Sequence, residues 1–207
     1  VAINTEAVIS NSVKLQGDIL SVMGENFDLS IFKKIKVVGF GKASIDAAVA
    51  LEKILGSKIK IGAVVGLSKV NLEHIETFAG THPKPSKMNI VAGKKIYKII
   101  KDSGAEDLII VLISGGGSAL LCYSEDECEQ SSALYDEFLK HGRTISEINT
   151  VRKHLSILKG GGLAKIAYPA TIIGLIFSDI PGDYFYDVAS GPTYKDESTV
   201  VDAQGII

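Results

Sequence analysis

The amino-acid sequence predicts an α/β protein with a Rossmann-like, doubly wound and mostly parallel sheet, helices on both faces and a small N-terminal hairpin. Short apolar runs alternate with segments whose apolar residues recur at helical spacing, which is typical of parallel strands joined by crossover helices. The 207 residues suit one α/β domain, and 46% hydrophobic and 22% charged residues are ordinary globular proportions. Because the net charge is −2, nucleic acid and anionic membranes are not expected as partners.

The strands are predicted from apolar runs bounded by glycine or polar residues. Residues 13–22 alternate around Gly17-Asp18, which predicts the hairpin. The later runs predict the strands of the parallel sheet, at 36–40, 62–67, 75–79, 108–113 and 170–177. The run at 75–79 is the weakest of these.

Helices are expected between and after these strands. Ile45, Val49 and Ile54 follow roughly helical spacing in the first of them, and Ser86 is a suitable cap for the second. The expected helices span 43–55, 88–100, 127–140 and 146–158, and another begins near Thr199.

Neither a membrane span nor a disulfide framework is expected. No apolar run reaches the length of a transmembrane helix, and the first residues lack the charged and then apolar segments of a secretory signal. Cys122 and Cys128 have no metal-site spacing and make no disulfide framework, so we expect a structural role for them or none. These observations favour a cytoplasmic location.

The most informative segment is the glycine run Ser114-Gly115-Gly116-Gly117-Ser118, which follows the predicted strand 108–113. Glycine lets backbone N–H groups approach an anion closely, and a helix that starts here would add its positive N-terminal end. Ligands of such sheets gather at the carboxyl ends of the strands. The run is therefore a candidate site for a phosphate or a carboxylate, with a tight turn or flexible linker as the alternative.

A second unusual loop, Gly39-Phe40-Gly41-Lys42-Ala43-Ser44, ends the first strand of the sheet. It has two glycines of a dinucleotide fingerprint, but Ser44 stands where the third glycine belongs. Lys42 would lie at the N-terminus of the following helix, where a cation is unfavourable unless an anion offsets its charge. Lys42 is thus a candidate anion ligand, and a solvated surface lysine is the alternative.

A third loop, after the strand at 170–177, carries the carboxylates Asp179 and Asp183 across a Pro-Gly turn. Two such groups are suited to hold Mg²⁺ or to accept the proton of a substrate hydroxyl. Asp, Pro and Gly also form ordinary turns, so a plain turn remains open. The small-residue loop 189–193 follows and adds hydroxyl donors.

The predicted helix 146–158 has a polar and basic face. On a helix, Asn149, Lys153 and Ser156 lie near one face, and Arg152 also lies near Ser156. Such a face is able to reach into the ligand cleft, but for an isolated charge cluster a solvated helix face is the preferred interpretation. His82, in a short turn before Pro83, is expected to be structural.

Together these segments resemble the N-terminal domain of the MOFRL-type glycerate 2-kinases, a group sometimes labelled hydroxypyruvate reductase. From about Val13 to the end, the family order is followed by GFGKAS, GTHPKP, LISGGGSALL, ISEINTVRKHLSILKGGGLA, SDIPGD and ASGPT. The resemblance implies transfer of the γ-phosphate of ATP to the 2-hydroxyl of D-glycerate, with Mg²⁺ as cofactor. Family members continue into a second domain, so residues 1–207 are expected to be the N-terminal domain of a two-domain kinase, without the C-terminal domain.

The resemblance also implies roles for residues. Lys42, Asp179 and Asp183 are the catalytic candidates, and Asp183 is also the candidate metal ligand. The candidate substrate or phosphate ligands are Ser114, Gly115, Gly116, Gly117, Ser118, Asn149, Arg152, Lys153, Ser190, Gly191 and Thr193. Gly162 departs from the family, which usually has a basic residue at that position. D-glycerate and ATP are the expected partners, and the exposed half of a cleft favours some self-association into a homo-oligomer.

Two other functions compete with this interpretation. An NAD(P)-dependent oxidoreductase acting on hydroxypyruvate needs a full dinucleotide fingerprint and an acidic residue after the second strand, where the sequence reads Gly66-Leu67-Ser68-Lys69. A non-catalytic domain that binds sugar phosphates also uses small-residue loops at strand ends. It does not need Lys42 together with Asp179 and Asp183.

Overall fold

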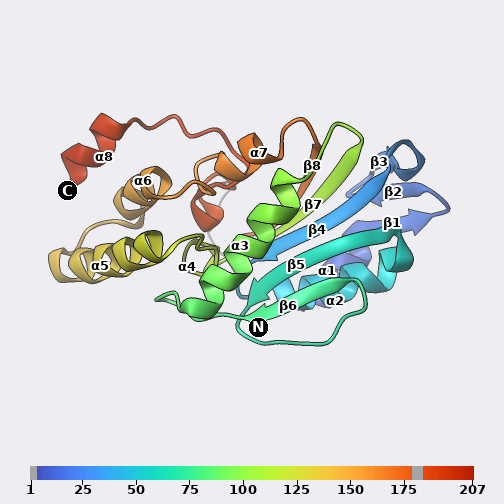
Figure 1. Ribbon diagram of the computed structural model, residues 1–207, viewed down its shortest axis with the longest axis horizontal. Helices are drawn as coiled ribbons and strands as arrows, with labels where there is room; N and C mark the ends of the chain where they lie inside the picture. Colours follow the sequence, from blue (N-terminus) through green and yellow to red (C-terminus); the bar gives the residue numbers. More distant parts are fainter. Residues whose placement is uncertain (1–3, 179–183) are drawn as a thin grey trace.

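A five-stranded parallel sheet forms the centre of the computed structural model, which describes residues 4–178 and 184–207 (Figure 1). Its strands are β4 (Lys34–Phe40), β5 (Ile59–Gly66), β6 (Ile75–Ala79), β7 (Asp107–Ser114) and β8 (Thr171–Phe177). The spatial order is β6-β5-β4-β7-β8, so the chain builds outward from β4 and then returns to its other side. This order confirms the predicted doubly wound α/β class and places a switch point between β4 and β7.

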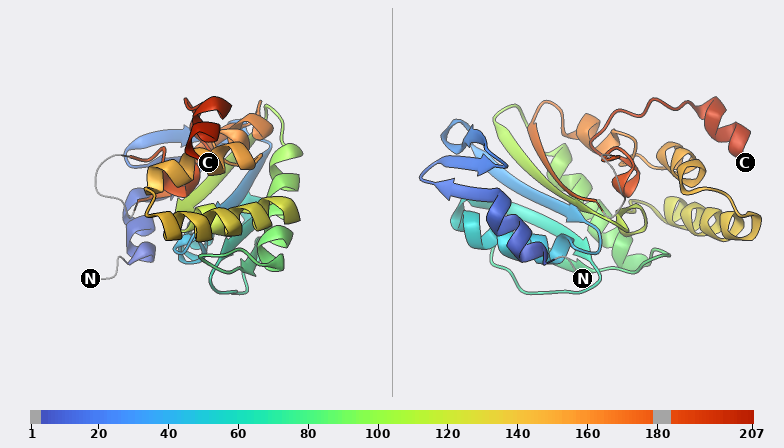
Figure 2. Two further views of the ribbon diagram at one scale, coloured as in Figure 1. Left: turned by 90° about the vertical axis from the view of Figure 1, so that its left-hand side faces the viewer. Right: turned by 180° about the vertical axis from the view of Figure 1, so that it is seen from behind.

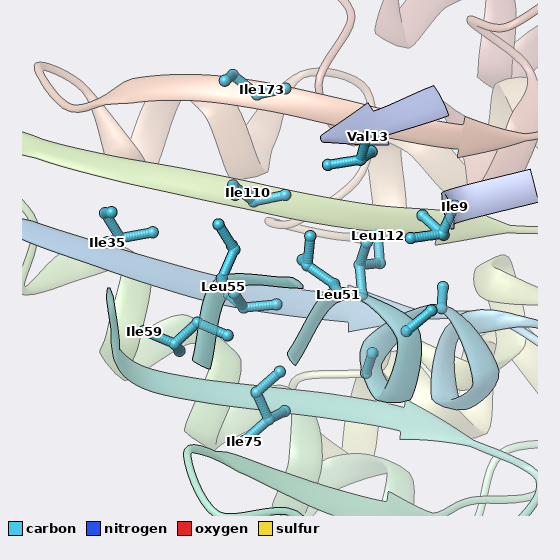
Figure 3. Close-up of a cluster of buried hydrophobic side chains, with 14 of the residues drawn as sticks. Ile9, Val13, Ile35, Leu51, Leu55, Ile59, Ile75, Ile110, Leu112 and Ile173 are labelled. Atoms are coloured by element: carbon cyan, nitrogen blue, oxygen red, sulfur yellow. The ribbon is translucent and has the colours of Figure 1, made fainter. Parts of the chain in front are cut away.

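Helices cover both faces of this sheet, as predicted (Figures 1 and 2). On one face lie α1 (Thr5–Ser12) and α2 (Ser44–Leu55), and on the other lie α3 (Lys87–Lys101) and α7 (Gly162–Ala167). Strand side chains alternate between the faces. Val37 belongs to the cluster under α2, which Figure 3 shows, and Val38 belongs to the cluster under α3. Because both faces are covered, the central strands read as continuous apolar runs.

A small antiparallel sheet precedes the main one. It contains the predicted hairpin, β1 (Val13–Gln16) and β2 (Ile19–Val22), and a third strand that was not predicted, β3 (Glu25–Asp28). Met23 and Gly24 join β2 to β3 with φ of 49° and 93°, which is the backbone of a tight two-residue hairpin turn. Three polar residues in four hide β3 from a search for apolar runs.

The helices α5 (Glu125–His141), α6 (Ile145–Leu155) and α8 (Val200–Ile206) gather beyond the carboxyl ends of the strands (Figure 1). The glycine run leads to them through the short helix α4 (Gly117–Leu120). The predicted helix 146–158 is shorter than expected and ends at Leu155. None of the described helices is long and apolar enough to cross a membrane.

Cys122 and Cys128 form a disulfide that links the segment after α4 to the first turns of α5. The expectation that the cysteines make no disulfide framework is corrected by this local pair. The sequence gives no sign of it, because only the fold shows that the end of α4 returns to the start of α5. Together with Ile90 the two cysteines make a small buried cluster.

Candidate functional site

The carboxyl ends of β4, β7 and β8 meet at one edge of the sheet. Phe40 is in register with Ile113, and Ser114 is in register with Phe177, as predicted for the three strand ends. A cavity of about 360 Å³ opens here, a volume suited to a small ligand. The cavity is lined by residues of all three strand ends and of α1, namely Thr5, Val8, Lys42, Ala43, Ser114, Gly115, Ile176, Phe177 and Ser178.

The loop after β4 is fastened to the glycine run by hydrogen bonds. Lys42 N–H donates to the carbonyl of Gly115 at 2.9 Å, and Ala43 N–H donates to Ser114 Oγ at 3.0 Å. Gly41 has φ of +128°, and any Cβ there would overlap Ser114, so only glycine fits this close approach. The buried Ser114 hydroxyl therefore holds the loop after β4 against the start of the glycine run. Ser44, at the third fingerprint position, lies 3.3 Å from the same hydroxyl.

Lys42 and His82 lie together over the turn of the glycine run. Gly116 has φ of +80°, and a Cβ there would stand 3.0 Å from both Lys42 Cε and His82 Cδ2. The ion pairs between described residues include none from Lys42, which is exposed. The sequence interpretation treated His82 as a structural turn residue. Its position just after β6, at the same edge as the other strand ends, is the signal that could have identified it.

Three predicted residues, Ser118, Ser190 and Asn149, form a hydrogen-bonded series that connects the glycine run to α6. Ser118 Oγ and Ser190 Oγ lie 2.9 Å apart, and Ser190 Oγ donates to Asn149 Oδ1 at 3.1 Å. Ala189 and Ser190 both have left-handed backbones, with φ of 54° and 61°. Such conformations are costly for non-glycine residues and cluster at functional sites.

The segment after α6 holds this hydrogen-bonded series in place. Gly160 N–H donates to the carbonyl of Ser190 at 2.9 Å, and Gly161 N–H donates to the carbonyl of Gly191 at 2.8 Å. A Cβ on Gly162 would overlap the carbonyl of Ile157. A basic side chain therefore does not fit at position 162 in this backbone conformation, which gives the departure from the family a structural reason.

The helices α5 and α6 and the segment that follows α6 form a lobe beyond the sheet. This lobe contains two buried cations with different surroundings. Lys159 Nζ lies 2.6 Å from Glu127 Oε1 and donates to the carbonyl of Leu121 at 2.8 Å. Arg152 is 7% exposed, and no acceptor meets its enclosed Nε atom. Burial lowers the pKa of the Arg152 guanidinium.

Other predicted residues lie apart from this group. Lys153 Nζ lies 3.7 Å from Asp187 and 3.6 Å from Asp196, in a separate polar cavity. Thr193 Oγ1 lies over the middle of β8, 3.8 Å from the position of a Cβ on Gly174. Asp179 and Asp183 fall outside the described residues. Within the described ranges, no group of three His, Cys, Asp or Glu residues is arranged to hold a metal ion.

Comparisons with known proteins identify the family of this chain. The model of a family described as "Domain of unknown function (DUF4147)" matches residues 1–207, and the chain belongs to that family. A putative hydroxypyruvate reductase from Agrobacterium vitis is 43% identical over 175 residues, which cover 83% of this chain and 40% of that protein. A glycerate 2-kinase from Pyrococcus horikoshii is 39% identical over 204 residues, which cover 96% of this chain and 45% of that protein.

A solved structure agrees with these sequence matches. The crystal structure of a glycerate kinase from Thermotoga maritima matches with a TM-score of 0.78 and 35% identity, over 84% of this chain and 43% of that chain. These comparisons confirm the resemblance to the glycerate 2-kinase family. The chain spans less than half the length of the relatives described here.

Proposed function

We propose that this member of the DUF4147 family is the phosphate-binding part of a glycerate 2-kinase, which transfers the γ-phosphate of ATP to the 2-hydroxyl of D-glycerate. The observation that carries the proposal is the position of Lys42 over Gly116, at the switch point between β4 and β7. An exposed lysine beside glycine backbone is suited to neutralise a phosphoryl group as its charge shifts. The kinases among its relatives support the same activity.

In this mechanism the 2-hydroxyl oxygen bonds to the γ-phosphorus while the bond from that phosphorus to ADP breaks. The hydroxyl proton goes to a carboxylate, for which we propose Asp179 or Asp183. Lys42 and the backbone of the glycine run hold the phosphates, and His82 lies within reach of the same turn. Asn149 and Ser190 shape the neighbouring wall.

Mg²⁺ would accompany ATP and offset the charge of its phosphates. The described residues offer no group of three His, Cys, Asp or Glu side chains for the metal. We propose Asp183, the metal ligand that the sequence analysis indicates, as its protein ligand. We further propose that the complete enzyme has a second domain that closes over the phosphates, and that it acts in the cytoplasm. Residues 1–207 alone are then expected to give no useful turnover, because the far side of the cleft is not among them.

A second candidate is the reductase named for the Agrobacterium vitis relative. Its main difficulty is Ser44, which fills the third fingerprint position and is fully buried against Ser114. The third glycine of a dinucleotide fingerprint allows the helix to pack closely against its strand, and Ser44 takes its place here. This arrangement favours the kinase.

One pair of assays on the complete protein separates the two candidates. The first assay supplies ATP, Mg²⁺ and D-glycerate and follows the phosphorylated product by ³¹P NMR. The second supplies hydroxypyruvate with NADH or NADPH and follows oxidation of the cofactor. We expect 2-phosphoglycerate and no oxidation. Cofactor oxidation without a phosphorylated product would reject the proposed function.

A further inference from the structure

We propose that Arg152 is the carboxylate receptor of this site and makes it select 2-hydroxy acids over neutral polyols. This inference rests on the proposed function and adds to it the residue that recognises the acid group. Arg152 comes from α6, outside the strand-end loops that carry Lys42 and the glycine run.

The first observation is a buried charge that no described carboxylate pairs with. Arg152 is 7% exposed, its Nε meets no acceptor, and the ion pairs and hydrogen bonds among residues 4–178 and 184–207 include none from its guanidinium. Burial lowers its pKa, yet a guanidinium stays charged at any physiological pH. Burying an uncompensated charge is costly, so an anion beside Arg152 would remove a large penalty.

The second observation is the local charge balance around Arg152. Lys159 is close enough for the two positive charges to repel, and burial first and then Arg152 lower the Lys159 pKa. Glu127 is the carboxylate that pairs with Lys159, through Oε1, and its Oε2 accepts from Tyr123 N–H. Among the described charges Arg152, Lys159 and Glu127, one positive charge is therefore left over. A monoanion such as a carboxylate matches that excess.

The third observation is the connection of Arg152 to the glycine run. Arg152 follows Asn149 by three residues on the buried face of α6, and Asn149 is linked through Ser190 to Ser118 of α4. Lys159, near Arg152, binds the carbonyl of Leu121 at the end of α4. Arg152 therefore lies on the helix that is hydrogen-bonded, through Asn149 and Ser190, to the helix that follows the glycine run.

The choice of arginine fits a carboxylate. Among the 22 basic residues of the chain, only Arg143 and Arg152 are arginines. The planar guanidinium matches both oxygens of a carboxylate, whereas an ammonium acts as a point charge. With Lys42 at the phosphates, Arg152 would fix the other end of the hydroxy acid.

The test compares Arg152→Met, Arg152→Lys and the control Arg143→Met in the complete protein. Arg143 is exposed and pairs with Glu147 at 3.0 Å. The readouts are the Tm without ligand, the Tm shifts given by D-glycerate and by ATP, and kcat/KM for D-glycerate and for glycerol. Glycerol has the hydroxyls but no carboxylate.

We expect Arg152→Met to keep or raise the Tm, because it removes an unpaired buried charge. Its D-glycerate shift should vanish while its ATP shift stays. Its kcat/KM for D-glycerate should fall about 10²-fold or more, the range for losing one partner of a buried charge pair, with no fall for glycerol. Arg152→Lys should recover little, and Arg143→Met should behave as wild type.

Two results would overturn the inference. A lower Tm for both Arg152 variants, with the glycerate preference kept in Arg152→Lys, would mean that Arg152 pairs with a protein carboxylate. An unchanged kcat/KM for D-glycerate in Arg152→Met would mean that the acid is bound elsewhere. If wild type transfers no phosphate, the proposed function fails, and the D-glycerate Tm shift alone still tests Arg152.

Discussion

Lys36, in strand β4, and Lys42, two residues beyond the end of that strand, have opposite surroundings. Near the amino end, buried Lys36 Nζ lies 2.9 Å from Asp107 Oδ2, and it donates to the carbonyl of Asp102 and to Ser103 Oγ, both at 2.8 Å. Beyond the carboxyl end, Lys42 lies over Gly116 and no described carboxylate pairs with it. A charged side chain that is paired within the protein stabilises the fold, whereas a charged side chain without such partners is available to a ligand.

The lobe beyond the sheet repeats this contrast. Lys159 has Glu127 and the carbonyl of Leu121, while Arg152 on the neighbouring helix has no described partner. Burial alone does not distinguish the two, because both are nearly enclosed. The protein partners distinguish them. Substituting a cation that has protein partners should therefore lower the Tm, whereas substituting one that lacks them should affect ligand binding or turnover.

The largest effect is expected at the partnered cation Lys159. Lys159→Met leaves the Glu127 carboxylate buried and unpaired, which should destabilise the complete protein by about 3–5 kcal/mol. Thermal unfolding measures this as a fall in Tm. Lys140→Met is the control, because its pair with Glu137 is exposed and should give no measurable shift. Equal shifts for the two variants would break the contrast.

A smaller effect is expected from Gly116→Val. The left-handed backbone at Gly116 should cost a branched residue about 1–2 kcal/mol, and the added side chain would displace Lys42 and His82. ATP affinity should fall about tenfold, which corresponds to about 1.4 kcal/mol. Isothermal titration calorimetry on the complete protein measures this affinity.

Gly104→Val is the matched control for that variant. A Cβ at Gly104 meets nothing within 4 Å, and φ there is not in the left-handed region. The control should bind ATP like wild type. If Gly116→Val also kept its affinity, the glycine run would have no part in nucleotide binding.

The smallest effect is a pH dependence at the amino end. Burial raises the pKa of the Asp107 carboxyl, but hydrogen bonds from Lys36 and Gly104 and nearby lysine charges outweigh burial and hold it below 3.8. A lowered carboxyl pKa contributes stability above the unfolded pKa, and this contribution is lost as pH falls through the folded value. Urea unfolding between neutral pH and pH values below 3.8 should show the loss.

The double variant Lys36→Met with Asp107→Asn sharpens this prediction. It removes both charges together, so neither is left buried alone. Its stability should depend less on pH in that acid range than the stability of wild type. The same acid dependence in both proteins would mean that other carboxylates cause it.

The sheet could be predicted because its strands are buried on both faces. β7 is an unbroken apolar run for that reason, and the strand-end rule then placed Lys42 beside the glycine run. Hydrogen-bond and ion-pair partners were harder to predict, because they come from segments far apart in the sequence. The Ser114 hydroxyl binds Ala43, and Lys153 pairs with Asp187 and Asp196.

Short elements and local pairs were also missed. Helix α1 was not predicted because its apolar residues are few, although Asn4 caps it by accepting a hydrogen bond from Ala7 N–H at 3.0 Å. The disulfide and the unsatisfied Nε of Arg152 among the described residues depend on how α4, α5 and α6 pack against one another. No periodicity in the sequence reports such a return. Asp179 and Asp183, which the sequence singled out, stay predictions.

The most direct test of the central claim measures kcat and Tm for Lys42→Met and Lys36→Met in the complete protein. We expect Lys42→Met to lower kcat for D-glycerate by about 10²-fold or more with an unchanged Tm, and Lys42→Arg to recover little. Lys36→Met should do the reverse, with a lower Tm and an unchanged kcat below its unfolding temperature. Full turnover by Lys42→Met would contradict the claim that this edge of the sheet transfers phosphate.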